Sequence, residues 1–253
     1  MSTKINEKED QEREPCVNDT KSPVDEIDRV RKAYEARDRD SVIQRYAWYQ
    51  PDVIHRQYHL NRALASCLRM AYGEDLSHMS VLDVGCGTGA FLRTLVEYGA
   101  DPHRLTGTEF LPDRLEQARA MSVSGIRWVL GDLKCIAEEG GVDLVSAFLV
   151  FSSVLDNEHR KKLACDMWNK VRPGGWVLVF DFAWNNPRNR DVLKVRVEEL
   201  NGYWESENRI IKRLILAPPI ARSSTKISYF ASELLALVPW LRSHFIYMAQ
   251  KTA

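Results

Sequence analysis

The chain has 253 residues with 35 acidic and 35 basic side chains, so its formal net charge at pH 7 is zero. That length is enough for one sizeable core, and the balanced charge gives no support to a nucleic-acid-binding protein. The longest apolar run near the C-terminus, 234–241, contains Pro239 and is too short to span a bilayer. No signal-peptide core opens the chain. Five scattered cysteines without a C-x-x-C pair predict reduced thiols in a cytoplasmic protein.

The first 40 residues differ in composition from the rest of the chain. They are rich in Lys, Arg, Asp and Glu, and they carry almost no large apolar residue before Val24. Such a segment cannot bury enough apolar surface to offset its ordering entropy, so residues 1–40 are predicted to be a disordered charged tail. Residues 41–75 follow as an N-terminal helical segment, where apolar side chains recur at helical spacing before Gly73. This spacing predicts a helix over about 52–72.

Strand-like and helix-like segments alternate from residue 79 onward. Short apolar runs predict strands, and runs of helical periodicity between them predict helices. The predicted strands are 80–85, 103–110, 126–132, 142–151, 176–182, 209–218 and 244–251, and the predicted helices are 90–99, 112–122, 158–175, 190–202 and 231–240. This alternation indicates an α/β fold with a parallel sheet covered on both faces. Open sheets of this kind bind ligands at the carboxyl ends of their strands.

A glycine-rich stretch, VLDVGCGTGAF, occupies residues 81–91 directly after the first predicted strand of this series. It lacks the lysine of a phosphate-binding P-loop. It also differs from the dinucleotide fingerprint G-x-G-x-x-G, because Gly89 follows Gly87 one residue early. With Asp83 two residues before Gly85, the stretch resembles the first motif of the class I S-adenosylmethionine (SAM) methyltransferases. The resemblance covers residues 79–182 well and the rest of the chain in general layout.

The resemblance implies a Rossmann-like doubly wound sheet, mostly parallel with a last antiparallel strand. Residues 76–253 would form the methyltransferase domain, and residues 41–75 a helical lid over the cofactor and the acceptor. A narrower resemblance, to bacterial methyltransferases of small molecules or glycans, rests on weaker patterns such as the segment 216–222. The implied cofactor is SAM, which leaves as S-adenosylhomocysteine.

The glycine loop suits SAM for physical reasons. Gly85, Gly87 and Gly89 let the backbone approach a ligand without a Cβ in the way. The helix that starts near Gly89 offers free N–H groups, which suit the methionine carboxylate of SAM. Asp83 either holds the loop or meets the ammonium group of the cofactor, and the sequence leaves both roles open.

Further cofactor residues follow the next strands, by the resemblance. Glu109 stands where the family places an acid that accepts both ribose hydroxyls, and Phe110 beside it could stack on the adenine. Asp132 stands near the expected adenine amine, with the amide of Leu133 next to it. Phe148 follows the fourth strand, where the family lines the cofactor pocket, although packing in the core is the alternative for this apolar residue.

Methyl transfer from a sulfonium is an in-line displacement, so catalysis is largely alignment and exclusion of water. A hydroxyl acceptor also needs a general base. The candidates are Asp181, at the end of the fifth strand, His159, and His55 or His59 on the N-terminal helix. Asp181 could instead satisfy the loop that follows it. Polar residues at the ligand edge and on the N-terminal segment are the candidates for substrate binding, namely Trp184, Asn185, Tyr46 and Arg62.

His55 and His59 are four residues apart and share one helix face. A zincin motif needs Glu directly after the first histidine, and Arg56 stands there. Surface or lid histidines are therefore predicted here, and no metal. A metal-dependent catechol-type site is also disfavoured, because the fourth strand ends in AFLVFSS without a carboxylate.

Three functions remain open from the sequence. The first is methylation of a small-molecule acceptor, at a hydroxyl of a sugar or secondary metabolite. The second is methylation of an amine, a protein or RNA, although the added basic domain and the N-P-P-[YF] motif typical of RNA enzymes are missing. The third is a SAM-binding partner subunit without catalytic activity. A homodimer is also left open.

Overall fold

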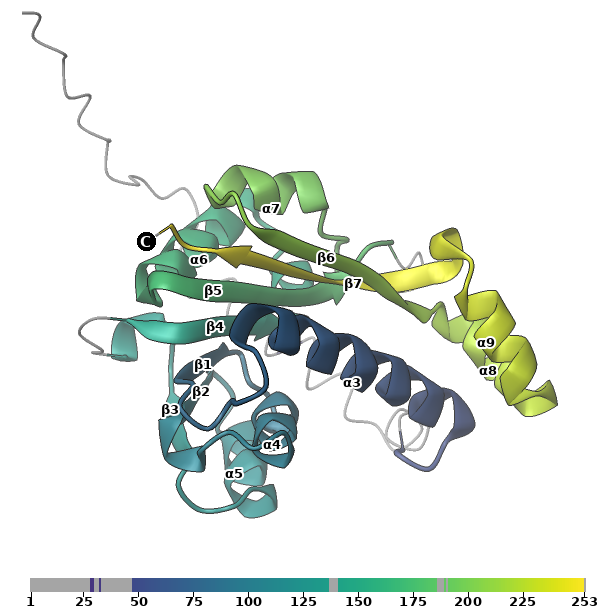
Figure 1. Ribbon diagram of the computed structural model, residues 1–253, viewed down its shortest axis with the longest axis horizontal. Coiled ribbons are helices and arrows are strands. Elements are labelled where there is room, and N and C mark those ends of the chain that lie inside the picture. The colour runs from purple at the N-terminus through teal and green to yellow at the C-terminus, as the bar shows by residue number, and fades with distance from the viewer. Residues whose placement is uncertain are drawn as a thin grey trace, which may run out of the picture.

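The computed structural model describes residues 28–29, 32, 47–136, 141–185, 189 and 191–252, and a single sheet organises them (Figure 1). The strand order is β3-β2-β1-β4-β5-β7-β6. The strands are β1 (Val81–Val84), β2 (Leu105–Glu109), β3 (Arg127–Leu130), β4 (Val142–Phe148), β5 (Val171–Phe182), β6 (Arg209–Leu216) and β7 (Arg242–Gln250). Pairs among β1 to β5 are parallel, and β7 is antiparallel to both β5 and β6. The predicted mostly parallel sheet with a last antiparallel strand is confirmed.

Helices cover both faces of the sheet, as predicted for a doubly wound fold (Figure 1). The helices of one face are α3 (Pro51–Tyr72) and α4 (Ala90–Glu97), and those of the other are α6 (Asn157–Lys170) and α7 (Val197–Tyr203). Successive side chains of a strand point to opposite faces. Val81 of β1 therefore joins the core beneath α3 and α4, whereas Leu82 joins the core beneath α6 and α7. A further helix, α5 (Pro112–Met121), packs on β2 and β3.

The ends of α3 follow from local chemistry. Pro51 occupies the first turn, where its missing N–H costs nothing, and Asp52 places a negative charge at the positive end of the helix dipole. Gly73 ends the helix at φ +80°, a conformation that glycine adopts without a Cβ penalty. The helix predicted over about 52–72 is confirmed.

Three helical predictions need correction. The helix expected over 158–175 ends at Lys170, because β5 already begins at Val171. The helix expected over 190–202 is shorter, because α7 begins only at Val197. Between β6 and β7 the chain forms two helices, α8 (Pro218–Ile227) and α9 (Tyr229–Ala236), where the sequence indicated only the second. The prolines at the start of α8 look like a turn signal, but proline is also favoured in the first turn of a helix.

Most of the predicted charged tail, together with Tyr46, lies outside the described residues. Asp28, Arg29 and Lys32 are described, and all three have helical backbone geometry. The guanidinium of Arg29 donates a hydrogen bond to the carbonyl oxygen of Ser153, which follows β4. Among the described residues, no helix combines the length and the hydropathy needed to cross a bilayer.

Candidate cofactor and acceptor site

The loop between β1 and α4 carries the three glycines of the motif in left-handed backbone conformations. Their φ angles are +61° at Gly85, +54° at Gly87 and +78° at Gly89. The last of these is the N-cap of α4 and gives that helix no side-chain cap. The backbone N–H groups of the first turn of α4 are thus not capped by the N-cap side chain, which suits an anionic group of a ligand.

Two of these glycines are also required by contacts within the chain. A Cβ atom on Gly89 would lie 2.4 Å from Cη2 of Trp128, and one on Gly85 would lie 2.9 Å from Cγ2 of Val150. At Gly87 the nearest atom to such a Cβ is 3.7 Å away, on the side chain of Arg114. The sequence interpretation assigned the glycines to ligand approach alone. The structure adds that Gly85 and Gly89 let the loop pack against its own protein.

Glu109 ends β2 and holds the glycine loop through its carboxylate. Its Oε2 accepts a hydrogen bond from the backbone N–H of Gly87 at 2.9 Å. Its Oε1 accepts from the N–H groups of Phe110 at 2.8 Å and Leu111 at 3.1 Å. An ionised carboxylate offers about four acceptor positions, so one remains for a ligand. Only 8% of Glu109 is exposed, which makes these charge-assisted bonds stronger than surface ones.

Asp83 is buried in the middle of the sheet rather than at its surface. It pairs in register with Ser146 of the neighbouring strand β4, whose hydroxyl donates to the carboxylate at 2.7 Å. Burial raises the pKa of Asp83 to about 7, the negative charge of Glu109 adds to the rise, and the hydrogen bond from Ser146 opposes it. Of the two roles left open by the sequence, the contacts of Asp83 support the one that organises the strand before the loop.

The raised pKa of Asp83 predicts a pH-dependent stability. A carboxyl group whose pKa is higher in the folded than in the unfolded chain stabilises the fold at low pH, and this contribution is lost as the pH rises through the folded pKa. The wild type should therefore lose stability between pH 4 and 7 by about 2–4 kcal/mol from this group. The Asp83→Asn variant should lose correspondingly less stability over the same pH range. Urea denaturation at pH 5 and pH 8 measures the difference.

The exposed Asp113, in the first turn of α5, provides a control for this comparison. Asp113→Asn should follow the wild type at both pH values. If Asp83→Asn also follows the wild type, the buried carboxyl is not the source of the pH dependence.

The carboxyl ends of β2 and β3 bring together the residues predicted for the adenosine part of SAM. Gly131 donates its N–H to the carbonyl of Glu109 at 2.9 Å, which joins the two strand ends. Asp132 caps the short helix η2 (Leu133–Cys135) by accepting from the N–H of Lys134 at 2.9 Å. Phe110 is 38% exposed, whereas Leu133 is buried in the core. Phe110 is therefore accessible at this edge and Asp132 is partly exposed there, whereas the side chain of Leu133 belongs to the core beneath α6 and α7.

The residues after β4 and β5 are largely occupied by internal contacts. Phe148 stacks on Phe91 of α4, with ring centroids 4.3 Å apart, and its ring lies tilted against Phe180 of β5 at 5.5 Å. Asp181 has no exposed surface, and its two oxygens accept from the N–H groups of Ser152 at 3.0 Å and Phe182 at 2.8 Å. Burial raises the pKa of Asp181 to about 6. Through these two bonds the buried carboxylate holds the turn after β4, a structural role of the kind that the sequence left open for it.

The remaining predicted residues are spread over several elements. His159, at the start of α6, places Nδ1 3.0 Å from the carboxylate of Asp156. Trp184 donates its indole N–H to the carbonyl of Arg242 at 3.0 Å, and the side chain of Asn185 accepts from the N–H of Lys194 at 2.7 Å. Both bonds fix the loop after β5. Arg62 is exposed on α3.

The sequence reasoning missed the partners of the predicted residues. Ser146 and Trp128 carry no motif, and only the pairing of strands places them beside Asp83 and the glycine loop. Glu233 of α9 is a further example, because it lies against the two histidines of α3.

Comparison with known proteins agrees with the geometry of this edge. Residues 81–175 match the family described as methyltransferase domain. A demethylmenaquinone methyltransferase of Tropheryma whipplei strain Twist is 31% identical over 129 residues, which cover 49% of this chain and 48% of that protein. The chain thus spans about half the length of the curated relatives it matches.

Solved structures show the same fold at low identity. The magnesium protoporphyrin IX methyltransferase of Synechocystis PCC 6803, solved with bound SAM, has a TM-score of 0.60 and 15% identity, over 92% of this chain and 100% of that one. The plantazolicin methyltransferase BpumL, in complex with a substrate analogue and S-adenosylhomocysteine, has a TM-score of 0.57 and 14% identity, over 91% and 98%. Residues 81–175 therefore match the methyltransferase domain family, within a chain that has the fold of these solved methyltransferases.

Proposed function

We propose that this chain transfers the methyl group of SAM to a small-molecule acceptor, and that the methylated atom is a hydroxyl oxygen of a sugar or secondary metabolite. The observation that carries the proposal is the meeting of the glycine loop, Glu109 and Asp132 at neighbouring strand ends, inside the region that matches the methyltransferase domain family. Each of these groups suits one part of SAM.

The chain's own groups would divide the binding of the cofactor among them. The N–H groups of the first turn of α4 would bind the methionine carboxylate, since they carry the positive end of the helix dipole. The remaining acceptor position of Glu109 would take a ribose hydroxyl, and the second oxygen of Asp132 would take the adenine amine. Phe110 would stack on the adenine ring. These contacts hold the sulfonium in place, and alignment is what methyl transfer chiefly requires.

The acceptor side is proposed to lie against α3 and the helices between β6 and β7. Asp52, at the start of α3, forms an ion pair of 3.3 Å with Arg222 of α8, so these segments are joined. We propose that residues 41–75 act as a lid there. Among the predicted general bases, His159 suits the role better than the fully buried Asp181, because its ring is partly exposed and Asp156 orients it.

Small-molecule acceptors are favoured over macromolecules by the names of the related proteins. Those names specify demethylmenaquinone, magnesium protoporphyrin IX and plantazolicin. A catalytically inactive SAM-binding subunit is the alternative, and a search for methyl transfer distinguishes it from an enzyme.

The test has two stages, starting with calorimetric titration of SAM and S-adenosylhomocysteine into the purified chain. Labelled SAM is then incubated with panels of hydroxylated sugars, phenols and amines. Binding followed by label transfer to a hydroxyl supports the proposal. Transfer only to amines would move the methylated atom to nitrogen, binding without transfer would favour the inactive subunit, and absence of binding would overturn the SAM site.

Asp132→Ala is expected to weaken SAM binding by about tenfold, because the variant loses a charged hydrogen-bond partner worth about 1–3 kcal/mol. The fold should survive, since Asp132 lies outside both cores. Calorimetric titration of SAM, with circular dichroism as a check of folding, measures the effect. A folded Asp132→Ala protein with wild-type affinity would remove this residue from the site.

A further inference from the structure

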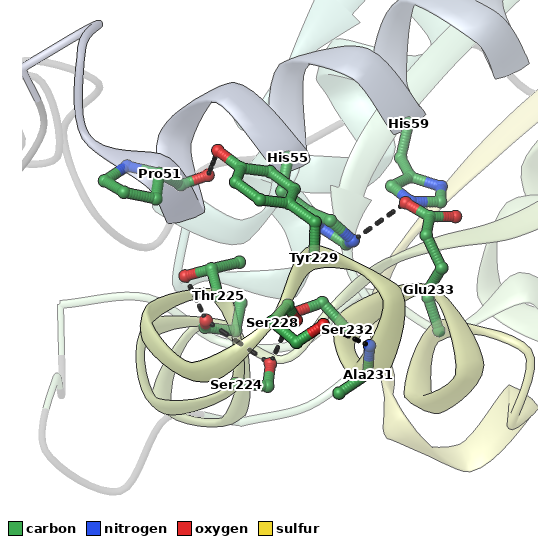
Figure 2. Close-up of polar contacts among 12 residues, drawn as sticks. Pro51, His55, His59, Ser224, Thr225, Ser228, Tyr229, Ala231, Ser232 and Glu233 are labelled. Carbon is green, nitrogen blue, oxygen red and sulfur yellow. Dashed lines mark hydrogen bonds and ion pairs between the residues drawn. The ribbon is translucent and has the colours of Figure 1, made fainter.

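Two histidines and a glutamate converge where α3 meets α9. His55 and His59 lie one turn apart on the same face of α3, with ring centroids 4.4 Å apart. Oε1 of Glu233, on α9, lies 3.2 Å from Nε2 of His55 and 3.0 Å from Nε2 of His59 (Figure 2). One ligand atom from each of the three residues lies within 4.8 Å of the other two. The sequence separates Glu233 from the histidines by more than 170 positions, and the fold brings them together.

The ring nitrogens of His55 lack hydrogen-bond partners among the described residues around them. His55 is only 2% exposed, so the expectation of a surface histidine is wrong for this residue. Neither of its ring nitrogens has a hydrogen-bond partner among the described residues, although Glu233 lies close to Nε2. Oε1 of Glu233 lies 3.2 Å from Nε2 as a charge contact, and no hydrogen bond joins the two atoms. Buried polar atoms are rarely left in this state, so a further partner is indicated.

A shared proton accounts for only part of the cluster. The contact of 3.0 Å between His59 and Glu233 has hydrogen-bond geometry, and a proton there satisfies that pair. The same proton leaves both nitrogens of His55 without a partner. A cation between the three groups satisfies Nε2 of both imidazoles and the carboxylate together.

The protonation state of His55 is compatible with a cation. Burial lowers the pKa of His55 and the nearby His59 adds to the decrease, whereas Glu233 opposes it. The neutral imidazole is the form that binds metal.

The helices that carry these residues are held in place by other contacts. The hydroxyl of Tyr229 donates to the carbonyl of Pro51 at 3.2 Å, which joins the start of α9 to the start of α3. Within the α8–α9 pair, the hydroxyl of Ser232 donates to that of Ser224 at 2.8 Å (Figure 2). The three side chains therefore converge on a frame that does not depend on them, as a preorganised ligand site requires.

We propose that His55, His59 and Glu233 bind one divalent transition metal ion of the zinc class at the junction of α3 and α9. Two imidazoles and a carboxylate are a donor set suited to such ions rather than to calcium or magnesium. Three protein ligands leave the fourth position of a tetrahedral ion open. Glu233 has 45% of its side chain exposed, so this position can be reached from solvent. The missing zincin glutamate does not count against this site, because that glutamate is the general base of a metalloprotease and not a metal ligand.

The proposal does not rest on methyl transfer, so its test uses metal binding alone. The full-length protein is stripped with a chelator and titrated calorimetrically with Zn²⁺, and with Co²⁺ while visible absorption is recorded. We expect one ion per chain, a visible band from bound Co²⁺, and a rise in Tm on adding Zn²⁺. The band arises when nitrogen and oxygen ligands coordinate Co²⁺. Side chains that serve only in packing would not produce such a band.

Variants at the more exposed ligands avoid disturbing the buried His55. His59→Gln and Glu233→Gln should each weaken Zn²⁺ binding at least tenfold and remove the visible band, with unchanged circular dichroism. His103 is an exposed histidine far from the cluster in sequence. His103→Asn should leave the Zn²⁺ affinity and the visible band unchanged, and it therefore controls for adventitious binding at the surface. Absence of stoichiometric binding by the wild type, or wild-type affinity in both ligand variants, would overturn the proposal.

Discussion

Glu109→Gln is expected to weaken the binding of SAM and S-adenosylhomocysteine in parallel, by about ten- to a hundredfold, and to lower the Tm of the ligand-free protein by about 3–10 °C. The carboxylate accepts three backbone N–H groups, one of them from the glycine loop. In Gln, an NH₂ group replaces one oxygen, so a donor faces backbone donors and the charge-assisted strength is lost. Both ligands carry the ribose, and the loss therefore does not depend on the methyl group.

Titration calorimetry and thermal denaturation measure these two effects separately. Glu116→Gln is the matched control, since Glu116 is an exposed glutamate on α5 and should change neither quantity. A Glu109→Gln protein with lower Tm but unchanged affinity would restrict Glu109 to holding the loop. Unchanged values of both would contradict the hydrogen bonds seen here.

Gly89→Ala should have the largest effect on stability of any single added methyl group in the loop. The new Cβ would lie 2.4 Å from Trp128, and the backbone stays at φ +78°. Left-handed backbone costs a non-glycine residue about 1–2 kcal/mol, and overpacking costs about 1–3 kcal/mol more. The expected loss of unfolding free energy is therefore about 2–5 kcal/mol.

Gly87→Ala offers a close comparison within the same loop. Its φ is also positive, but the nearest atom to the new Cβ is 3.7 Å away, so only the backbone cost of about 1–2 kcal/mol applies. Urea denaturation of both variants, and of Gly89→Ala combined with Trp128→Leu, separates clash from backbone strain. Leucine at position 128 lacks the indole ring, so it should restore the part of the unfolding free energy that the clash removes. Equal costs at Gly87 and Gly89 would show that Trp128 is not responsible.

The sequence was sufficient to predict the fold wherever a local pattern repeats. The apolar spacing of α3, with Pro51 and Gly73 at its ends, is one example. The alternation of strands and helices up to β5 is another, because each element buries a stripe or face that shows in the sequence. Prediction was poorer after β5. The helix α8, for example, is joined to a distant part of the chain by the ion pair between Asp52 and Arg222.

The candidate site shows the same division between local and distant information. Spacing from the glycine motif was enough to select Glu109 and Asp132, whose places follow from the order of strands. Spacing did not show that Glu109 holds the loop, or that Asp181 has both oxygens bonded to backbone N–H groups. His55 and His59 were weighed without Glu233, since no local pattern reports a contact between α3 and α9.

The position of β7 inside the sheet bears on how the chain is made. A ribosome completes β7 last, yet this strand pairs with β5 from Trp176↔Gln250 to Phe182↔His244 and with β6 on its other side. A nascent chain that has reached Leu216 contains β5 and β6, but neither can take its final neighbour. Both therefore present open edges, which are sites for pairing with other chains. Completion of the sheet has to wait for residues 242–250, so a stop codon before Arg242 would leave the edge of β5 unpaired.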